Sequence, residues 1–528
     1  MQGLRLRWSC SKGRNVQPIL SRMQLRRYDE EAVRNGIPSL VLMENAARGA
    51  AEILERTILL ARGGLRGKHV HILVGPGNNG GDGLALARHV LTRGGRPFVH
   101  LAADPQDMRG DAQSMLDAWT SFGGAVRMLG ARPSFGDDLT ADDIVVDALV
   151  GTGLQRDVEG RVREAAALVD AHPGLRIALD LPSGLDAETG RVRGFAPHVD
   201  HTITFATMKM GLLTGEGVLH SGRVHVADLA VPPALLSIVG TVGEVFEVDD
   251  MREHLRRRAT DTHKVREGHT LVLAGSPGKT GAAMLSARGA LRAGSGLCSL
   301  HTDPQSLASV DGRLPELMVE GLPPTLRVAD FDALVAGKHA VVIGPGFGVG
   351  GRTGELLEHL FARYAAPIVV DADAITTLGR RPDLTSNVPP HAILTPHAGE
   401  AARMLDTTPE AIEADRFSAL QDLVTLTRCT VLLKGARTLI GSPGRPPQAV
   451  VTGSSALAVG GSGDVLAGMI GAFCLKLEPF EAARVAATLH GLAADRFTAE
   501  TGSDRGLLPS ELADRLPRLI GEFLPSPR

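Results

Sequence analysis

The sequence is poor in cysteine and in aromatic residues, and both shortages limit the kind of protein it encodes. Its four cysteines, Cys10, Cys298, Cys429 and Cys474, lie far apart and form no CxxC pair. This spacing excludes a disulfide-rich scaffold and a cysteine-ligated zinc site, and it predicts a reduced, cytoplasmic setting. Aromatic residues make up only 3% of the chain, so its cores must be built from Ala, Val, Leu and Ile. That composition favours parallel sheets covered by helices over aromatic-rich sandwiches or barrels.

The chain also lacks a large excess of charge and a long apolar run. Its formal net charge is −3, which provides no basic field of the kind that binds nucleic acid. No uninterrupted apolar run of about 18 residues occurs, so we predict no membrane span. Neither nucleic acid nor a membrane is therefore an expected partner.

Length and pattern together predict two α/β domains. A single hydrophobic core stops growing at about 250–300 residues, and this chain has 528. Apolar runs alternate with helical stretches up to Pro232–Pro233, and a second alternating series starts near Thr270. The predicted domains span residues 23–238 and 263–528, with a charged linker at 239–262 between them.

The first 22 residues form a separate, basic segment without an acidic residue. One interpretation is an amphipathic transit peptide, and the other is a disordered extension, which we favour. No long apolar stretch follows the basic residues, so secretion is not expected. The basic residues of this segment are Arg5, Arg7, Lys12, Arg14 and Arg22.

The strongest motif of the first half is the sequence GPGNNGGDG at Gly75–Gly83, between a predicted strand and a predicted helix. Its five glycines allow backbone N–H groups to face outward as an anion-binding nest at a helix N-terminus. The motif is neither GxGxxG nor a P-loop. Asn78, Asn79 and Asp82 add side-chain amides and a carboxylate, which suit a nucleotide accompanied by a cation.

Two further loops follow predicted strands and carry oxygen ligands. Asp147 precedes the sequence GTG, and Asp180 begins the sequence DLPSGLDAETG, which contains Ser183. Hard oxygen ligands of this kind suit an alkali or alkaline-earth cation better than zinc. An Asp after a strand more often caps a helix or turn. Three glycine-dense loops at neighbouring strand ends nevertheless favour a site. Lys209 is one of few lysines, and contact with substrate phosphate and simple surface exposure are equally open for it.

These motifs, with LMENAARGAAE at Leu42–Glu52, resemble the NAD(P)H-hydrate epimerase family, the YjeF N-terminal domain, from about Gln24 to Pro232. The resemblance implies a Rossmann-like three-layer sandwich that binds the hydrates NADHX and NADPHX. It implies that Asp180 lies at the reacting nicotinamide ring, where we expect it to act as general acid and base during inversion at C6. It implies a potassium site at Asn79, Asp147 and Ser183. The residues implied to bind the dinucleotide are Asn78, Asn79, Gly80, Gly81, Asp82, Gly151, Thr152, Gly153, Leu154, Gln155, Arg156 and Asp157.

The strongest motif of the second half is AVGGSGDVLAGMIGAF at Ala458–Phe473. Its glycines open an apolar helix, whose N–H groups and dipole favour a phosphate. Asp464 lies in the first turn, where a carboxylate can deprotonate a hydroxyl while the N–H groups stabilise a transferring phosphoryl group. The alternative is that Asp464 only complements the helix N-terminus. Lys434 and His397 also follow predicted strands, although a single His is usually structural.

This half resembles the ribokinase-like ADP- or ATP-dependent NAD(P)H-hydrate dehydratase family from about His263 to Asp495, including the run from His263 to Leu297 and the sequence PELM. The resemblance implies phosphorylation of the C6 hydroxyl with Asp464 as base, followed by loss of phosphate. It implies Mg²⁺ with ADP or ATP, and we expect ADP because the fused order is typical of bacterial members. The residues implied to contact the hydrated substrate are Ala282, Gly348, His397 and Asp464. Those implied to contact the nucleotide are Lys434, Gly435, Ala436, Arg437, Thr438 and Gly463.

The second half departs from the family's usual sequence at two places, and two alternative functions stay open. The loop GPGFG carries Phe where the family usually has Leu, and the stretch before the anion-binding helix lacks the family's Asn-Pro. One alternative is a ribokinase-like small-molecule kinase. The other is a first half that serves only as a nucleotide-binding or assembly module. The expected protein is a bifunctional, homo-oligomeric repair enzyme that epimerises and then dehydrates NADHX and NADPHX.

Overall fold

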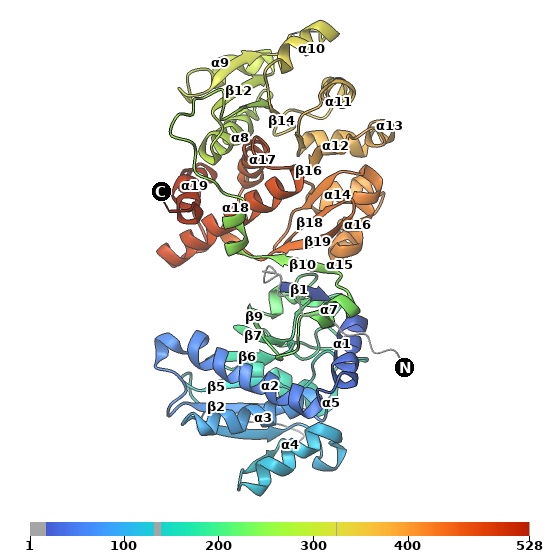
Figure 1. The fold of residues 1–528 in the computed structure, drawn as a ribbon, viewed down its shortest axis with the longest axis vertical. Coiled ribbons are helices and arrows are strands. Elements are labelled where there is room, and N and C mark those ends of the chain that lie inside the picture. Colours follow the sequence, from blue (N-terminus) through green and yellow to red (C-terminus); the bar gives the residue numbers. More distant parts are fainter. Residues whose placement is uncertain (1–16, 131–138, 324, 527–528) are drawn as a thin grey trace.

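The computed structural model describes residues 17–130, 139–323 and 325–526. Two α/β domains lie end to end, with the N-terminal domain below and the C-terminal domain above in Figure 1. Each contains one sheet with helices on both faces, as the sequence predicts. Among the described helices, none is long and apolar enough to cross a membrane.

The N-terminal sheet has seven strands in the order β4-β3-β2-β5-β6-β7-β9, and every pair is parallel. The chain moves outward from β2 through β3 and β4, then returns to β5 and moves the other way. This reversal between β2 and β5 is the place where ligands bind in open α/β sheets. The strands are β2 (His69–Val74), β3 (Arg96–Leu101), β4 (Val126–Met128), β5 (Ile144–Ala148), β6 (Leu175–Leu179), β7 (His201–Phe205) and β9 (Arg223–Ala227).

Helices cover both faces of this sheet and form two separate apolar cores. Leu84 and Ile72 belong to the core under α1 to α4, whereas Leu73 and Val169 belong to the core under α5. The three layers match the predicted sandwich. The helices are α1 (Arg22–Arg34), α2 (Ser39–Ile53), α3 (Asn78–Thr92), α4 (Gly110–Ser121), α5 (Gly160–Ala171), α6 (Gly217–His220) and α7 (Ala234–Val239).

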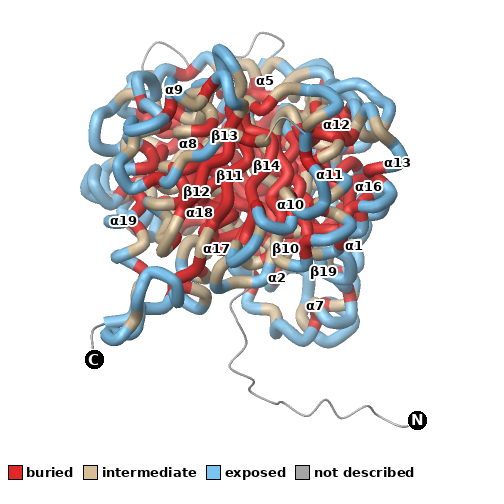
Figure 2. Tube along the Cα trace, turned by 90° about the horizontal axis from the view of Figure 1, so that it is seen from above, coloured by how far each residue is buried: buried red, intermediate tan, exposed pale blue. Residues whose placement is uncertain are grey.

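Seven parallel strands make up most of the C-terminal sheet, in the order β13-β12-β11-β14-β15-β16-β17, and the β18–β19 hairpin extends it. Figure 2 shows these buried central strands enclosed by helices with exposed outer faces. The strands are β11 (His269–Leu273), β12 (Leu297–Thr302), β13 (Met318–Gly321), β14 (Ala340–Ile343), β15 (Ile368–Val370), β16 (Ala392–Leu394), β17 (Thr430–Leu433), β18 (Thr438–Ser442) and β19 (Arg445–Val450).

The C-terminal helices also divide between two cores. Val465 and Leu512 belong to the core on one face, and Leu357 and Leu420 to the core on the other. The helices are α8 (Thr280–Ala293), α9 (Leu307–Val310), α10 (Val328–Val335), α11 (Gly351–Arg363), α12 (Asp373–Gly379), α13 (Pro382–Thr385), α14 (Ala398–Met404), α15 (Pro409–Ala414), α16 (Arg416–Thr427), α17 (Ser462–Phe473), α18 (Pro479–Thr501) and α19 (Pro509–Phe523).

Three short strands join the two domains through the larger sheet. β10 (Gly243–Phe246) pairs with β19, β1 (Gln17–Leu20) pairs with β10, and β8 (Met208–Lys209) pairs with β1, which makes twelve strands in all. The apolar core is continuous across this junction, because Leu181 and Val245 belong to the same cluster as Val341.

The junction corrects two features of the predicted domain boundaries. Residues 17–22 of the expected disordered extension are ordered as β1 and the start of α1, and residues 1–16 lie outside the described part. The expected linker contains β10. Both segments are ordered because each supplies a strand whose backbone groups pair with a neighbour.

Candidate functional site

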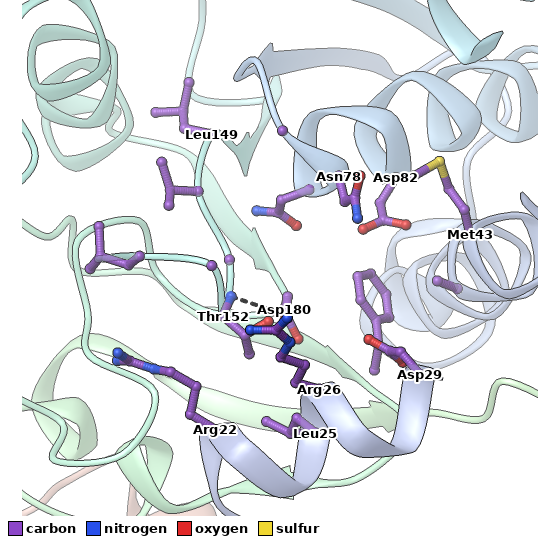
Figure 3. A pocket seen from close by; sticks show the side chains of 18 of the residues that line it. Arg22, Leu25, Arg26, Asp29, Met43, Asn78, Asp82, Leu149, Thr152 and Asp180 are labelled. Carbon is purple, nitrogen blue, oxygen red and sulfur yellow. Dashed lines mark hydrogen bonds between the residues drawn. The ribbon is translucent and has the colours of Figure 1, made fainter. Parts of the chain in front are cut away.

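A cavity of about 1560 Å³ opens at the carboxyl ends of the N-terminal strands. Its walls come from α1, the loops after β2 and β5, the end of β6 and the segment around β8 (Figure 3). It is lined by the predicted catalytic residue Asp180 and by most predicted dinucleotide-binding residues: Asn78, Asn79, Asp82, Gly151, Thr152, Gly153, Leu154, Gln155, Arg156 and Asp157. The volume exceeds that of a typical small-ligand pocket, so it suits a molecule as large as a dinucleotide.

Gly80 and Gly81 are not among the residues that line this cavity. A Cβ atom on Gly80 would lie 2.0 Å from the carbonyl oxygen of Gly75, and one on Gly81 would lie 2.7 Å from the side chain of Met43. These glycines therefore allow α3 to pack closely on its neighbours. Of the glycines in this loop, only Gly77 lines the cavity, and the space that a Cβ atom would occupy there is open.

Asp180 is held at the floor of the cavity by two contacts. One carboxylate oxygen lies 2.8 Å from Nζ of Lys209, and the other accepts a hydrogen bond from the backbone N–H of Thr152 at 3.1 Å. Its backbone has φ of +66°, a left-handed conformation that costs energy for a residue other than glycine. A Cβ on Gly151 would lie 2.7 Å from this carboxylate, so the loop requires glycine there.

Lys209 is a buried partner of Asp180 and is only 1% exposed. Its ammonium group also donates to the carbonyl oxygen of Phe205 at 2.6 Å. The surface alternative for Lys209 is therefore wrong. No local pattern marks this role, because the partner lies 29 positions away and the two meet only in the folded chain.

Among the other carboxylates that line the cavity, those of Asp82 and Asp29 have raised pKa values. Burial, together with the negative charges of Asp180 and Asp29, raises the pKa of Asp82 well above its usual value. Desolvation by the surrounding walls raises the pKa of Asp29 to about 6, although Lys209 opposes the shift. Asp29 lies on α1, faces the open cavity and is exposed there. Sequence reasoning missed it, since a single Asp on an amphipathic helix looks like a solvated residue.

The three residues predicted to hold potassium lie beside the cavity floor. Asp147 is fully buried, and its carboxylate accepts hydrogen bonds from the N–H of Leu149 and from the N–H and hydroxyl of Ser183. Burial raises the pKa of Asp147 to about 6, although the bonds from Ser183 oppose the shift. Asn79 donates through Nδ2 to Leu179, but its buried Oδ1 accepts no hydrogen bond from a described residue. An unpartnered oxygen beside a buried carboxylate suits a monovalent cation. No cluster of three His, Cys, Asp or Glu side chains suited to a metal occurs in the described residues.

The second site lies at the carboxyl ends of β14 to β17, which are consecutive neighbours in the sheet. Gly348, Asp371, His397 and Lys434 follow these four strands in that order. Asp464 is the third residue of the facing helix α17. The fold therefore brings together the predicted residues of this half at one sheet edge.

A partly buried lysine, Lys434, also organises this site. Nζ of Lys434 lies 2.8 Å from Asp371 and 3.9 Å from Glu400, and a Cβ on Gly463 would lie 3.7 Å from it. Burial disfavours the charge on Lys434, but these two carboxylates and Asp464 outweigh it and raise its pKa. Asp371 and Glu400 were not predicted as site residues. Their positions after two neighbouring strands could have indicated that they belong to the site.

Asp464 has the electrostatics of a base that titrates near neutrality. Burial and the negative charges of Asp371 and Asp373 raise its pKa to about 7, although Lys434 opposes the shift. Glu400 behaves similarly, since burial and Asp371 raise its pKa to about 7 against the opposing charge of Lys434.

His397 serves as the N-cap of α14. Its Nδ1 accepts hydrogen bonds from the N–H groups of Gly399 and Glu400, and its side chain is 54% exposed. One ring nitrogen therefore caps the helix, and the other, Nε2, lies 3.4 Å from a carboxylate oxygen of Glu400. Burial and the charge of Lys434 lower its pKa, so the neutral form dominates at neutral pH.

The loop after β14 packs beside the start of α8. A Cβ on Gly346 would lie 2.9 Å from Cβ of Ala282, and the N–H of Gly348 donates to Asp373 at 2.9 Å. Gly348 has φ of +97°, which other residues rarely adopt. This contact brings the predicted residues Ala282 and Gly348 into one wall.

The predicted nucleotide-binding turn, Lys434–Thr438, is fixed from beneath by Arg416. This buried guanidinium donates to the carbonyl oxygens of Leu433, Lys434 and Arg437. A Cβ on Gly435 would lie 2.4 Å from the same group. Arg416 therefore holds the turn in place through hydrogen bonds to its backbone.

Comparisons with known proteins cover both halves. Residues 39–211 match a family model described as YjeF-related protein N-terminus, and residues 270–518 match one described as NAD(P)H-hydrate dehydratase. The chain is 36% identical over 495 residues to the bifunctional NAD(P)H-hydrate repair enzyme Nnr of Moorella thermoacetica, covering 92% of this chain and 93% of that one. It is 32% identical over 503 residues to the enzyme of the same description from Escherichia coli, covering 94% and 92%. Among solved structures, an ADP/ATP-dependent NAD(P)H-hydrate dehydratase from Bacillus subtilis, co-crystallised with ATP and Mg²⁺, is 29% identical with a TM-score of 0.46 and covers 53% of this chain and 98% of that chain.

Proposed function

The chain belongs to the family of bifunctional NAD(P)H-hydrate repair enzymes, and we propose that it restores hydrated NADH and NADPH in two steps. The N-terminal domain epimerises the R and S hydrates at C6, and the C-terminal domain dehydrates the S hydrate at the expense of a nucleotide. The observation that carries this proposal is the presence of two separate sites, each with a carboxylate near a lysine: Asp180 with the buried Lys209, and Asp464 near the partly buried Lys434.

In the epimerase site we assign Asp180 to proton transfer at C6. The carbon inverts if its hydroxyl leaves as water, while N1 forms a double bond to C6, and water then adds to the other face. Asp180 would exchange a proton with one of these oxygens, and its ion pair with Lys209 fixes the position of the carboxylate. The loop from Gly151 to Asp157 and residues Asn78, Asn79 and Asp82 would hold the dinucleotide.

We propose that Asn79, Asp147 and Ser183 hold potassium. The unpartnered Oδ1 of Asn79 and the buried charge of Asp147 support this set. The cation would compensate that charge and fix the loop before the substrate binds. Replacement of K⁺ by tetramethylammonium should lower epimerase activity and the melting temperature of the N-terminal domain. Asn79→Ala should abolish the effect of K⁺ on melting, and a melting temperature that stays equally K⁺-dependent would contradict this site.

In the dehydratase site we assign Asp464 as the base. It removes the proton of the C6 hydroxyl, whose oxygen attacks the terminal phosphorus of the nucleotide, and the N–H groups at the start of α17 stabilise the phosphoryl oxygens. With ADP as donor, AMP leaves. Loss of phosphate from C6 and of a proton from C5 then restores the double bond. Ala282, Gly348 and His397 would contact the substrate, and the turn Lys434–Thr438 with Gly463 would contact the nucleotide.

We further propose that Mg²⁺ accompanies ADP. Mg²⁺ usually binds to nucleotide phosphates and only one or two carboxylates. Asp371, Glu400 and Asp464 surround a single lysine, so this site has the negative charge that such an ion requires. The ion would neutralise charge on the phosphates.

We also propose three broader features of the chain. The domains would correspond to residues 23–238 and 263–528. The free, buried thiols of Cys298, Cys429 and Cys474 support a cytoplasmic setting. Exposed apolar side chains on α1 and α2 support a homo-oligomer, which light scattering would test: Met23, Val33, Leu40 and Val41.

One experiment tests the whole proposal. A mixture of both hydrate epimers is given K⁺, Mg²⁺ and either ADP or ATP, and the return of reduced-nicotinamide absorbance is followed. Full recovery with one nucleotide supports both activities and identifies the donor. Recovery that stops at the S fraction would mean that the first half is only a binding module, and a retained phosphorylated product would mean a kinase. The relatives that span both halves do not favour the kinase alternative.

A further inference from the structure

Among the charged side chains that line the epimerase cavity, four come from four different elements and act on one another electrostatically. Asp29 comes from α1, Asp82 from α3, Asp180 from the end of β6 and Lys209 from β8. Only Lys209 is positive among them. Asp180 forms an ion pair with Lys209, which leaves Asp29 and Asp82 without an ion-pair partner among these four residues.

Inversion at C6 requires proton transfer on both faces of the nicotinamide ring. The departing hydroxyl takes a proton on one face, and the incoming water loses a proton on the other. A single carboxylate reaches one face of a bound ring, so a second group on another wall is required. Asp180 already occupies the wall at the end of β6.

We propose that Asp29 is a second catalytic residue of the epimerase, acting on the face of the ring opposite to Asp180. This inference rests on the proposed epimerase function. In one direction, Asp29 gives its proton to the C6 hydroxyl, the C6–O bond breaks with its electron pair, and water leaves as N1 forms a double bond to C6. Water then bonds to C6 from the other face, the double-bond electrons return to N1, and Asp180 takes the released proton. The reverse direction exchanges the two roles, and solvent in the open cavity resets them.

The position of Asp29 is fixed by the anchors of its helix. Ser21 and Gln24 form a capping box at the start of α1, and Arg22 forms an ion pair with Asp186 at 2.6 Å. Leu20, just before the helix, pairs with Lys209 in the sheet. The helix that carries Asp29 is therefore tied to the strand that carries the partner of Asp180.

The surroundings of Asp29 suit a group that donates a proton. Desolvation raises its pKa to about 6, Asp180 and Glu30 add to the shift, and Lys209 opposes it. Asp82 is another acidic side chain of the cavity, but it is only 9% exposed, whereas Asp29 is exposed and faces the cavity. In acid and base pairs of active sites, the two carboxyl groups typically lie in environments that shift their pKa values apart. The family model for the first half begins at residue 39, so α1 lies outside the matched region.

The test compares single variants of the full chain. Asp29→Asn should lower kcat for conversion of the R to the S hydrate about 10²-fold, with little change in KM, as loss of a general acid does. Glu31→Gln makes the same chemical change on α1 outside the cavity and should leave epimerisation unchanged. Dehydration of the pure S hydrate, catalysed by the other domain, should be unchanged in both variants. Removal of a charge repelled by Asp180 and Glu30 should also leave the fold intact, and circular dichroism would verify this.

The outcomes separate this inference from the proposed function. Loss in both Asp29→Asn and Asp180→Asn supports two catalytic carboxyl groups, and partial recovery in Asp29→Glu supports the acid role. Loss in Asp180→Asn alone, loss in Asp82→Asn in place of Asp29→Asn, or a change confined to KM would overturn it while the epimerase function stands. A wild-type chain without epimerase activity would overturn both.

Discussion

Nζ of Lys209 lies 2.8 Å from a carboxylate oxygen of Asp180, at the last strand of a sheet that begins in the other domain. The backbone of Lys209 pairs with β1, β1 pairs with β10, and β10 pairs with β19 of the C-terminal hairpin. An unbroken hydrogen-bonded ladder therefore connects the dehydratase domain to the proposed catalytic group of the epimerase.

Lys209→Met should impair both the stability and the activity of the N-terminal domain. Asp180 would remain buried without its cation, and removing one partner of a buried pair costs about 3–5 kcal/mol. Thermal unfolding and the epimerase rate measure these effects. Lys209→Arg keeps the charge and should retain more of both, and a Met variant as stable as wild type would show that the pair contributes little.

Removal of residues 1–20 should reduce epimerase activity much more than removal of residues 1–16. The longer deletion removes β1, whose residues Ile19 and Leu20 pair with Met208 and Lys209. A displacement of about 1 Å in a catalytic group can cost about 10²-fold in rate. Dehydratase activity should persist in both deletions. Equal epimerase rates for the two truncated proteins would show that β1 does not position Lys209.

The dehydratase should gain activity as pH rises through about 7. Asp464 must be deprotonated to act as a base, and its pKa is raised to about 7, so activity is present above that pH and lost below it. Asp371→Asn removes a negative charge that raises this pKa, which should move the rising limb of kcat/KM to lower pH. Glu410→Gln, at an exposed position, should leave the limb in place. A limb that does not move in Asp371→Asn would exclude Asp464 as the group responsible.

Gly80→Ala should destabilise the N-terminal domain, whereas Gly77→Ala should have little effect. The added methyl group at position 80 would lie 2.0 Å from the carbonyl oxygen of Gly75, but the position at residue 77 is open. Overpacking of this kind typically costs about 1–3 kcal/mol. Urea unfolding compares the two variants, and equal stabilities would contradict the close packing of α3 against the loop after β2.

Much of each site follows from local sequence. A buried strand followed by glycines and a polar residue marks the carboxyl end of a parallel strand, and such ends meet at one edge of a sheet. For this reason Asp147, Asp180 and Lys434 could be placed at strand ends that carry a site from motifs alone. The glycines of α3 were predicted to form an anion-binding nest, whereas Gly80 and Gly81 allow close packing of the helix. The sequence does not distinguish these two roles, because glycine serves in both.

The sequence by itself determined the two α/β domains, their strands and the loops that carry chemistry, because periodicity and turn residues act within a few positions. Only the tertiary structure decided that Lys209 meets Asp180, that Asp29 enters the same cavity, and that β1 and β10 join the two domains into one sheet. These pairings depend on strand register and on the shape of distant surfaces. A four-residue strand such as Gln17–Leu20 carries too short a pattern to specify its partner, which is selected only when the surrounding core closes around it.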